Sequence, residues 1–279
     1  MYSMSLKGEE QEKLRQKYNP DGSLLRKDQM ELLRMMQVFA DICARNNIQW
    51  WLSSGTLLGA ARHQGFIPWD DDADVVMLRK DYKRLEKILY NMQNEEFVFH
   101  TPKTDVEYVN VFGKFRKRSG SISTKARRNK YYQWTGIGFD IFAIEKTNYL
   151  SARLASVIYN NVQHLTSYIK ISIIRRILIR IIEFLCLGVI NPILRLTGMI
   201  NPKGEYHYML GTGWARHTFY MKDTFPLTTA LFEGVEFPVP NNTDAYLANV
   251  YGDWRKLPSE DFIKKCIHCL QYRKEIYGE

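Results

Sequence analysis

Residues 50–78 read WWLSSGTLLGAARHQGFIPWDDDADVVML, which joins an apolar start, a break of small residues and a dense group of acids. The aromatic and apolar beginning suits a buried strand, and it breaks at Ser53-Ser54-Gly55-Thr56. Four aspartates then occupy five positions, directly before the apolar residues 75–78. Carboxylates crowded this closely repel one another, so a cation between them is the simplest way to keep them beside an apolar strand.

The aspartates differ in what their positions predict. Side chains two residues apart on a strand share a face, so Asp72 and Asp74 point the same way while Ala73 packs on the other side. Two carboxylates placed in this way can hold Mg²⁺ or Mn²⁺ together with the phosphate oxygens of a substrate. Asp70 has the same parity and is predicted to be a further metal ligand or a supporting group, whereas Asp71 is expected to face solvent.

A third carboxylate, Asp140, is embedded in the apolar run IGFDIFA of residues 137–143. A carboxylate inside such a strand is costly to bury without a partner, which favours a functional role over one satisfied by backbone amides alone. We therefore predict that Asp140 completes the site from an adjacent strand. It would act there either as a metal ligand or as the base that takes a proton from the acceptor.

Gly55 and Thr56 lie where the first predicted strand gives way to a short helix, expected over residues 56–62. Glycine permits close backbone approach, and the first helix amides and the threonine hydroxyl can donate hydrogen bonds to a phosphate. Basic residues on this helix and on a later strand are predicted to contact phosphates as well. They are Arg62, His63, Lys114 and Arg116.

The order of the predicted elements describes an α/β (mixed α+β) fold. Helices are expected over residues 28–44 and 80–92, strands over 48–53, 72–78, 97–100, 108–115 and 137–143, and a hairpin over 229–239. The composition changes after residue 149. We therefore divide the chain into a catalytic core (1–150), a basic Ile/Leu-rich helical insert (151–200) and a C-terminal part that completes the site (201–279).

Residues 165–200 are dense in isoleucine and leucine but are interrupted by basic residues. The longest uncharged run lies between Glu183 and Arg195, which is shorter than the roughly 20 residues that a spanning helix needs. The sequence therefore argues against a transmembrane segment. Two interpretations stay open, a basic amphipathic helix on an anionic membrane surface and a helical subdomain packed on the core.

Apolar residues make up 45% of the chain and the net charge is +9, which allows a sizeable core and favours an anionic partner. The polar amino end lacks the apolar centre of a secretory signal, so a cytoplasmic location is expected. Cys266 and Cys269 have CxxC spacing, but there is no second pair for zinc. We interpret them as ordinary reduced cysteines.

The runs GTLLGAARHQGFIPWDDDADV, GFDIFAI and YGDWRKLP together resemble the LicD family, which is related to the fukutin proteins and belongs to the nucleotidyltransferase-fold superfamily. The resemblance extends from about residue 32 to residue 258 and is weakest in the Ile/Leu-rich insert. It implies a nucleotidyltransferase-like core, with a mixed β-sheet flanked by helices. It also implies transfer of phosphocholine, or a similar phospho-alcohol, from a CDP-linked donor to a sugar of a glycan precursor.

The implied partners are CDP-choline or a related CDP-alcohol and a glycan acceptor of the lipopolysaccharide or teichoic acid kind, with no role for nucleic acid. Such an acceptor can be lipid-linked, which would place the enzyme in the cytoplasm at the inner face of the membrane. Position by position, the GS motif of the superfamily falls on Gly55-Thr56, its metal-binding DxD on Asp72 and Asp74, and its third acid on Asp140. Thr56 in place of serine keeps the hydroxyl.

A choline headgroup needs aromatic faces around its quaternary ammonium. Packing in the core is the competing role for every aromatic residue near the motifs. The candidates are Trp69, Tyr131, Tyr132, Trp134, Tyr251 and Trp254.

Three other functions compete with phospho-alcohol transfer. A DxD glycosyltransferase would use the same aspartates with a nucleotide sugar, but its DxD normally follows a larger nucleotide-binding βαβ region. Nucleotidyl transfer would use the same carboxylates as well. A non-enzymatic basic scaffold leaves the clustered aspartates unexplained.

Overall fold

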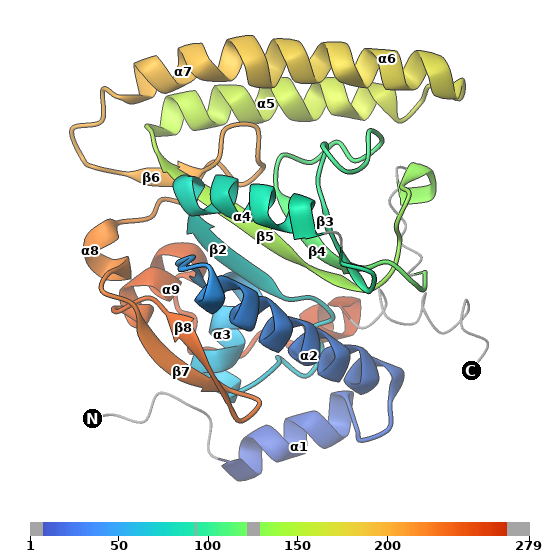
Figure 1. Cartoon of the computed structure of the whole chain (residues 1–279). Coiled ribbons are helices and arrows are strands. Elements are labelled where there is room, and N and C mark those ends of the chain that lie inside the picture. The colour runs from blue at the N-terminus through green and yellow to red at the C-terminus, as the bar shows by residue number, and fades with distance from the viewer. Residues whose placement is uncertain (1–7, 93, 122–128, 267–279) are drawn as a thin grey trace. The chain divides into compact units, whose positions relative to one another are not determined.

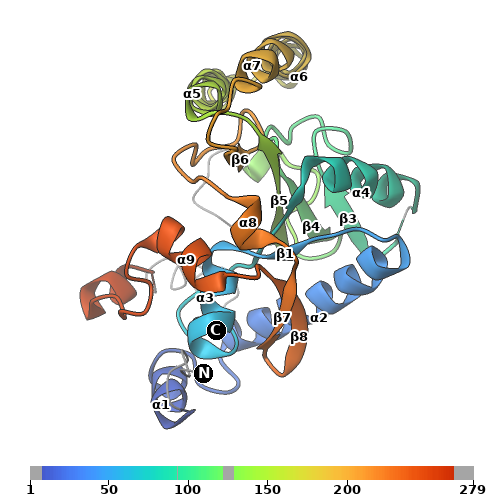
Figure 2. The same ribbon diagram turned by 90° about the vertical axis from the view of Figure 1, so that its left-hand side faces the viewer.

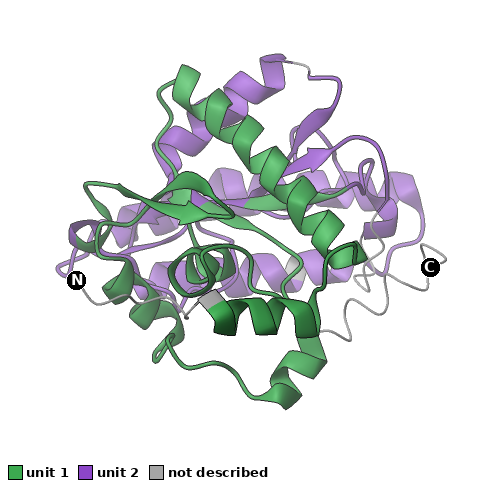
Figure 3. Cartoon of the chain, turned by 90° about the horizontal axis from the view of Figure 1, so that it is seen from below, with its two compact units in different colours: residues 1–75, 137–140, 223–279 green, residues 76–136, 141–222 purple. Residues whose placement is uncertain are grey.

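The computed structural model describes residues 8–92, 94–121 and 129–266. Two compact units make up the chain (Figure 3). Unit 1 comprises residues 1–75, 137–140 and 223–279, and unit 2 comprises residues 76–136 and 141–222. Helices and strands occur in both units, which confirms the predicted mixed α/β class. The division into residues 1–150, 151–200 and 201–279 stays a prediction.

Six strands form one sheet in the order β1-β2-β5-β4-β3, with β6 pairing to β5 (Figure 1). Their bounds are β1 Trp51–Leu52, β2 Asp74–Leu78, β3 Phe97–His100, β4 Gly113–Lys117, β5 Gly138–Lys146 and β6 Tyr206–Tyr208. The pairs β3–β4 and β5–β6 are antiparallel, with Phe97 opposite Lys117 and Ile144 opposite Tyr208.

Unit 1 is built around α2 (Leu24–Arg45). This helix starts at Ser23, whose hydroxyl accepts a hydrogen bond from the amide of Arg26 and so satisfies one of the free donors of the first turn. Its apolar face, which includes the fully buried Leu32, Met36 and Phe39, packs in the core as the helical spacing predicts. The other helices of this unit are α1 (Gly8–Tyr18), α3 (Ser54–His63) and α9 (Thr243–Tyr251).

The predicted hairpin is present as β7 (Thr228–Phe232) and β8 (Val235–Val239), which pair antiparallel with Phe232 opposite Val235. Both turn residues have positive φ angles, 51° at Glu233 and 78° at Gly234. The carboxylate of Glu233 accepts two hydrogen bonds from Arg26 and one from the amide of Phe66. The turn thereby joins α2 to the loop that leads toward the aspartates.

Unit 2 holds α4 (Arg79–Met92), β3, β4, β6, most of β5 and three helical segments that follow α5 (Tyr149–Thr166). These segments are α6 (Ser172–Glu183), the π-helical η2 (Phe184–Ile190) and α7 (Asn191–Gly198). They run on without a break as one helix of 27 residues, Ser172–Gly198. Together with α5 it forms a helical hairpin, named here the α5–α7 hairpin.

By length and composition, Ser172–Gly198 is long and apolar enough to cross a membrane. The sequence argued against a transmembrane segment because the uncharged run between Glu183 and Arg195 is too short. The helix that contains this run has 27 residues, more than the roughly 20 that span a bilayer, so its length does not exclude a membrane span.

Several predicted boundaries differ from the structure. The strand expected over residues 48–53 is reduced to Trp51–Leu52, and the one expected over 108–115 starts at Gly113. The polar amino end contains α1, with Glu9 and Glu10 in its first turn and Arg15 and Lys17 in its last, an order that suits the helix dipole. Cys269 of the CxxC pair lies outside the described residues.

Candidate active site: an acidic cluster and a cavity in unit 1

The aspartate-rich segment is held in place before β2 by hydrogen bonds to its backbone. The amide of Asp70 donates to the carbonyl of Ile67 at 2.9 Å, which closes a turn. Gln29 of α2, itself buried, donates to the carbonyl of Asp70 at 2.8 Å. The position of the first aspartate is therefore fixed through the main chain, which leaves its carboxylate available for chemistry.

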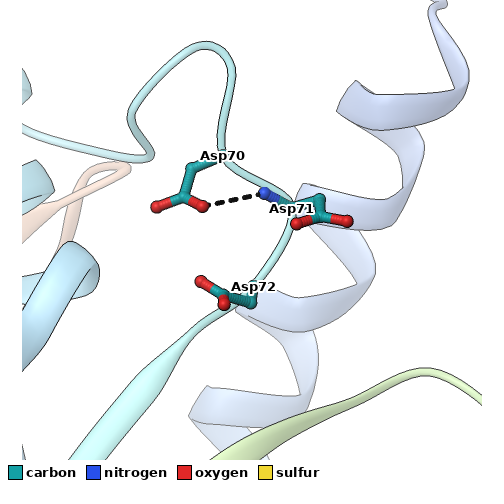
Figure 4. Close-up of side chains that lie close together, drawn as sticks. All are labelled: Asp70, Asp71 and Asp72. Carbon is teal, nitrogen blue, oxygen red and sulfur yellow. Dashed lines mark hydrogen bonds between the residues drawn. The ribbon is translucent and has the colours of Figure 1, made fainter. Parts of the chain in front are cut away.

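Asp70, Asp71 and Asp72 form a cluster in which each carboxylate offers an oxygen and these oxygens all lie within 4.8 Å of one another (Figure 4). The amide of Asp71 donates to Asp70 Oδ1 at 3.1 Å. The expectation that Asp71 faces solvent is corrected, because Asp71 is half-buried in this cluster and Asp72 is the exposed member. Carboxylate oxygens are the ligands that Mg²⁺ and Mn²⁺ prefer, so the donor set fits such a cation.

Asp74 is the first residue of β2, and its amide donates to the hydroxyl of Thr56 at 2.7 Å. Ala73 and Val75 are fully buried whereas Asp72 and Asp74 are not. Further along β2, Val76 and Met77 are fully buried as well, so the strand is covered on both faces there. Asp72 lies just before the strand begins, so the predicted strand is two residues too long at this end.

Asp140 comes from β5, and its amide donates to the carbonyl of Ala73 at 2.9 Å. Its backbone therefore lies beside the residue between Asp72 and Asp74. Asp140 is half-buried, while Phe139 and Ile141 on either side are fully buried. The backbone of the third predicted acid thus lies next to the segment that carries the first two. The group of described acids whose oxygens lie within 4.8 Å of one another consists of Asp70, Asp71 and Asp72, so a joint site with Asp74 and Asp140 stays a prediction.

The electrostatics of the cluster favour a bound cation. Burial, reinforced by the charges of Asp72 and Asp71, raises the pKa of Asp70 well above its ordinary value. Burial and the charges of Asp74, Asp70 and Asp72 also raise the pKa of the Tyr251 phenol. Both shifts report a concentration of negative charge, which a divalent cation would offset.

The start of α3 is fitted closely to this cluster. A Cβ atom on Gly55 would lie 2.7 Å from Asp70 Oδ2, so a side chain at this position would displace the carboxylate. Ser53, the residue before the helix, contacts the hydroxyl of the buried Tyr246 at 3.1 Å. The hydroxyl of Thr56 accepts from Asp74 and keeps its own proton to donate. Gly55 and Thr56 therefore have structural reasons for their identity in addition to the predicted phosphate contact.

A cavity of about 380 Å³ lies in unit 1 and is lined by Asp70 of the acidic cluster and by residues of the C-terminal motif. It brings together six residues predicted from the sequence, Gly55, Arg62, Trp69, Asp70, Tyr251 and Trp254. The sequence did not single out Leu58, Ile67, Asp253, Lys256, Pro258, Phe262 and Cys266, which also line it. Lys256, an exposed cation, and Asp253 belong to the quoted run YGDWRKLP, so a signal for them was present.

Arg62 and His63 have a different environment from the one predicted. Arg62 is 4% exposed and its Nη1 donates to the carbonyls of Trp254 and Lys256, at 2.9 and 3.1 Å. Its Nε donates to His63 Nε2 at 2.9 Å, and His63 Nδ1 contacts Gln11. Burial and the neighbouring guanidinium lower the pKa of His63 to about 3, so this imidazole is neutral at pH 7 and offers no charge to a phosphate. Burial lowers the pKa of Arg62 to about 10, which leaves it protonated.

The remaining predicted site residues lie in unit 2. Lys114 and Arg116 share a face of β4, as predicted, and Arg116 is buried with its Nη1 donating to the carbonyl of Trp134 at 3.1 Å. The aromatic candidates of this unit have close neighbours on their rings. The guanidinium of Arg175 lies 3.6 Å from the ring centre of Tyr131, Tyr132 packs against His100 and Tyr108, and Trp134 packs against His100 and Arg118.

Comparisons with known proteins show which family this chain resembles. Residues 47–164 match the family described as LicD/FKTN/FKRP, nucleotidyltransferase domain. The lipopolysaccharide cholinephosphotransferase LicD of Haemophilus influenzae is 26% identical over 253 residues, which cover 85% of this chain and 93% of that protein.

Two further relatives match over shorter stretches. The uncharacterized protein RP689 of Rickettsia prowazekii is 44% identical over 63 residues, 23% of this chain and 24% of that protein. The human ribitol 5-phosphate transferase FKRP is 44% identical over 41 residues, 15% of this chain and 8% of that protein. The family resemblance drawn from the motifs is confirmed by these matches.

Proposed function

Because residues 47–164 match the family described as LicD/FKTN/FKRP, nucleotidyltransferase domain, we propose that this phosphotransferase moves phosphocholine, or a similar phospho-alcohol, from a CDP-linked donor to a sugar hydroxyl. The acceptor is the precursor of a cell-surface glycan such as lipopolysaccharide or teichoic acid. One observation carries the proposal. Three carboxylates with oxygens within 4.8 Å of one another adjoin a cavity of about 380 Å³ that is lined by Gly55, Arg62 and Lys256.

We assign a divalent cation to Asp70, Asp71 and Asp72, whose carboxylate oxygens lie within 4.8 Å of one another. We propose Asp74 and Asp140, on the adjoining strands β2 and β5, as further ligands. Mg²⁺ or Mn²⁺ held by them would neutralise the pyrophosphate of the donor and stabilise the charge on the departing CMP. Asp140 has two alternative roles within the proposal, as a ligand of the cation or as the base that takes the proton of the acceptor hydroxyl.

The chain itself contributes positioning and charge. Phosphoryl transfer of this kind depends mainly on aligning the attacking oxygen with the leaving oxygen and on neutralising charge. The amides at the start of α3 and the Thr56 hydroxyl would bind phosphate oxygens, and Lys256 adds a cation on the cavity wall. In the reaction the acceptor oxygen forms a bond to the phosphorus of phosphocholine, the bond to CMP breaks, and the acceptor loses its proton.

Trp69, Tyr251 and Trp254 line the cavity and are the aromatic candidates that fit a choline headgroup best. A hydrogen bond from Trp254 Nε1 to Asp244 Oδ1, at 2.9 Å, fixes the position of the Trp254 ring. We place the reaction in the cytoplasm at the inner face of the membrane, since precursors of surface glycans are commonly lipid-linked. The proposal involves no nucleic acid.

Release of CMP from CDP-choline in the presence of Mg²⁺ and a glycan acceptor tests the proposal. We expect Asp72→Ala and Asp74→Ala each to reduce turnover at least about 100-fold, because each removes charge stabilisation at the reacting phosphate. Asp41→Ala is the matched control, since Asp41 is an exposed aspartate of α2 and should keep full activity. Full metal-dependent turnover in both site variants would show that the reaction centre lies elsewhere.

A panel of nucleotides separates the competing functions. Thermal unfolding is recorded with Mg²⁺ and either CDP-choline, CDP-ribitol, CDP-glycerol, a UDP-sugar or ATP, because a ligand that binds the folded state raises the melting temperature. We expect a CDP-alcohol to give the largest increase. Stabilisation by a UDP-sugar alone would instead indicate a glycosyltransferase, and release of pyrophosphate from a nucleoside triphosphate would indicate nucleotidyl transfer.

A further inference from the structure

The helix Ser172–Gly198 of unit 2 exposes an unbroken apolar stripe along its whole length. Its members within this helix are from 40% exposed, at Val189, to 71% exposed, at Ile173. Members recur every three or four residues, so they share one face of the helix. The stripe consists of Ile173, Ile174, Ile177, Ile181, Phe184, Leu185, Val189, Ile193 and Leu196, and Met199 and Ile200 continue it. A contiguous apolar surface of this extent usually marks an interaction site.

The opposite face of the same helix carries polar residues and is turned into the protein. Arg175 is 4% exposed, and its Nε and Nη2 donate to the two carboxylate oxygens of Glu107 at 2.8 and 2.9 Å. Arg195 donates to both oxygens of Glu145 at 2.7 and 3.2 Å. Asn191 is buried and donates to the carbonyl of Leu210 at 2.9 Å. Ile179 and Cys186 are buried as well, so ion-paired and apolar residues share the inner face, while large apolar side chains are left exposed on the outer face.

The partner helix α5 lies alongside and adds to the apolar surface (Figures 1 and 2). Ala152 and Ala155 of α5 pack in a small core with Leu194 of α7. A Cβ atom on Gly198 would lie 2.3 Å from Thr147 Oγ1, so the end of the long helix also fits closely against unit 2. The exposed apolar residues of α5 are Tyr149, Leu150, Leu154, Val157 and Leu165.

The charge of the hairpin complements an anionic surface. Residues 149–204, which are the hairpin and the six residues after it, contain seven lysines and arginines and one acid, Glu183, a formal charge of +6. Two of these arginines, Arg175 and Arg195, are paired with Glu107 and Glu145 outside this range. Arg176 and Arg180 are four residues apart and flank the apolar stripe on one side, with more than half of each side chain exposed. Arg180 also lines an open cavity of about 550 Å³ with three lysines, Lys83, Lys87 and Lys103, and one acid, Glu86, which accepts hydrogen bonds from Lys83 and Lys103.

We propose that the α5–α7 hairpin docks unit 2 on an anionic lipid bilayer, with the apolar stripe in the boundary between headgroups and acyl chains. The flanking basic residues would then contact lipid phosphates. The proposal does not depend on the transfer reaction. It applies equally if the acidic cluster serves another substrate.

The ion pairs of the inner face decide how the hairpin lies. Arg175 and Arg195 are 20 residues apart, which corresponds to roughly 30 Å of helix. Both are bound to carboxylates of unit 2, at Glu107 and Glu145. A helix held to a folded unit over that length lies along the membrane surface and does not cross the bilayer while these contacts persist. A second copy of the chain is a poorer occupant, because it would bring two basic hairpins together.

Co-sedimentation with lipid vesicles tests the proposal. The full chain is mixed with vesicles of phosphatidylcholine alone or with added phosphatidylglycerol. We expect it to sediment with the anionic vesicles and to be released by high salt. The triple variant Ile173→Glu, Ile177→Glu, Ile181→Glu should lose at least about tenfold in partitioning. Leu231→Glu is the matched control, because Leu231 is an exposed apolar residue of unit 1, on β7, and should leave partitioning unchanged.

Other results would overturn the proposal. Parent protein that stays in solution with every vesicle would exclude lipid docking, and light scattering that shows a dimer converted to monomer by the triple variant would assign the face to a second copy. Resistance to alkaline carbonate extraction would replace surface docking with a spanning helix. Circular dichroism shows whether the triple variant is folded. If it is not, Arg176→Glu with Arg180→Glu takes its place, and we expect about a tenfold or larger loss of binding to anionic vesicles.

Discussion

Replacing glycine by alanine at three helical positions tests how the acidic cluster is held. At Gly55 the new Cβ would lie 2.7 Å from Asp70 Oδ2, well inside van der Waals contact. Alanine stabilises a helix by about 1 kcal/mol relative to glycine, while overpacking costs about 1–3 kcal/mol. The free energy of unfolding should therefore fall by only about 0–2 kcal/mol, because the blocking atom is the end of a side chain that can turn away.

In Gly55→Ala, Mg²⁺ binding should change more than the free energy of unfolding does. A displaced Asp70 carboxylate leaves the cation with poorer coordination, so we expect Gly55→Ala to weaken Mg²⁺ binding by about tenfold or more. Calorimetric titration with Mg²⁺ measures the affinity, and urea unfolding measures the stability. Unchanged Mg²⁺ affinity in this variant would refute a ligating or supporting role for Asp70.

Two other glycines provide the controls. At Gly59 the blocking atom is the backbone oxygen of Gly65 at 2.4 Å, which cannot turn away, so Gly59→Ala should lose at least about 2–3 kcal/mol of stability. At Gly188 the nearest atom is 3.7 Å away, so Gly188→Ala should gain about 1 kcal/mol with normal Mg²⁺ binding. If Gly55→Ala were as destabilising as Gly59→Ala, the distinction between side-chain and backbone obstruction would be wrong.

Two more predictions concern stability. Since the pKa of Asp70 is raised in the folded state, the folded protein binds more protons than the unfolded chain above the ordinary value of 3.8, so the stability of the metal-free protein should fall as the pH rises toward the raised pKa. Asp70→Asn should remove this fall in urea unfolding measured across that range, and parallel curves for the two proteins would contradict it. Glu233→Ala should cost about 2–3 kcal/mol, because it leaves the largely buried Arg26 and the amide of Phe66 without their shared acceptor. The exposed Glu236→Ala should change the free energy of unfolding by less than about 0.5 kcal/mol, and an equal loss in both would show that the ion pair is unimportant.

The parts of the fold that depend on local spacing were predictable from the sequence. The period of α2, the hairpin that turns at Glu233 and the alternation around Asp74 all follow from neighbours a few residues apart. The backbone of Asp140 lies beside Ala73, on the strand next to the aspartate-rich segment, while its predicted part in the site stays a prediction. Local patterns of this kind do not depend on how distant segments meet.

The features that were missed depend on contacts between distant segments. Arg62 looks like a phosphate ligand next to a glycine-rich turn, but its Nη1 is used by carbonyl oxygens of Trp254 and Lys256, nearly 200 positions away. The sequence placed Asp71 toward solvent because it extended the strand to residues 72 and 73. In the structure β2 begins at Asp74, and carboxylate oxygens of the three preceding aspartates, residues 70–72, lie within 4.8 Å of one another. Strand parity says nothing about residues outside the strand.

The positions of the arginines in the structure show which anionic partner the positive net charge supports. A net charge of +9 suggested an anionic partner, and a nucleotide was one candidate. Residues 149–204 carry +6 of this charge, and only +3 is left for the rest of the chain, which includes the acidic cluster and its cavity. The excess positive charge therefore belongs to the α5–α7 hairpin and supports an anionic bilayer as its partner. A nucleotide at the acidic cluster would depend for neutralisation on a cation held by aspartates, because like charges of protein and phosphate repel there until a cation is bound.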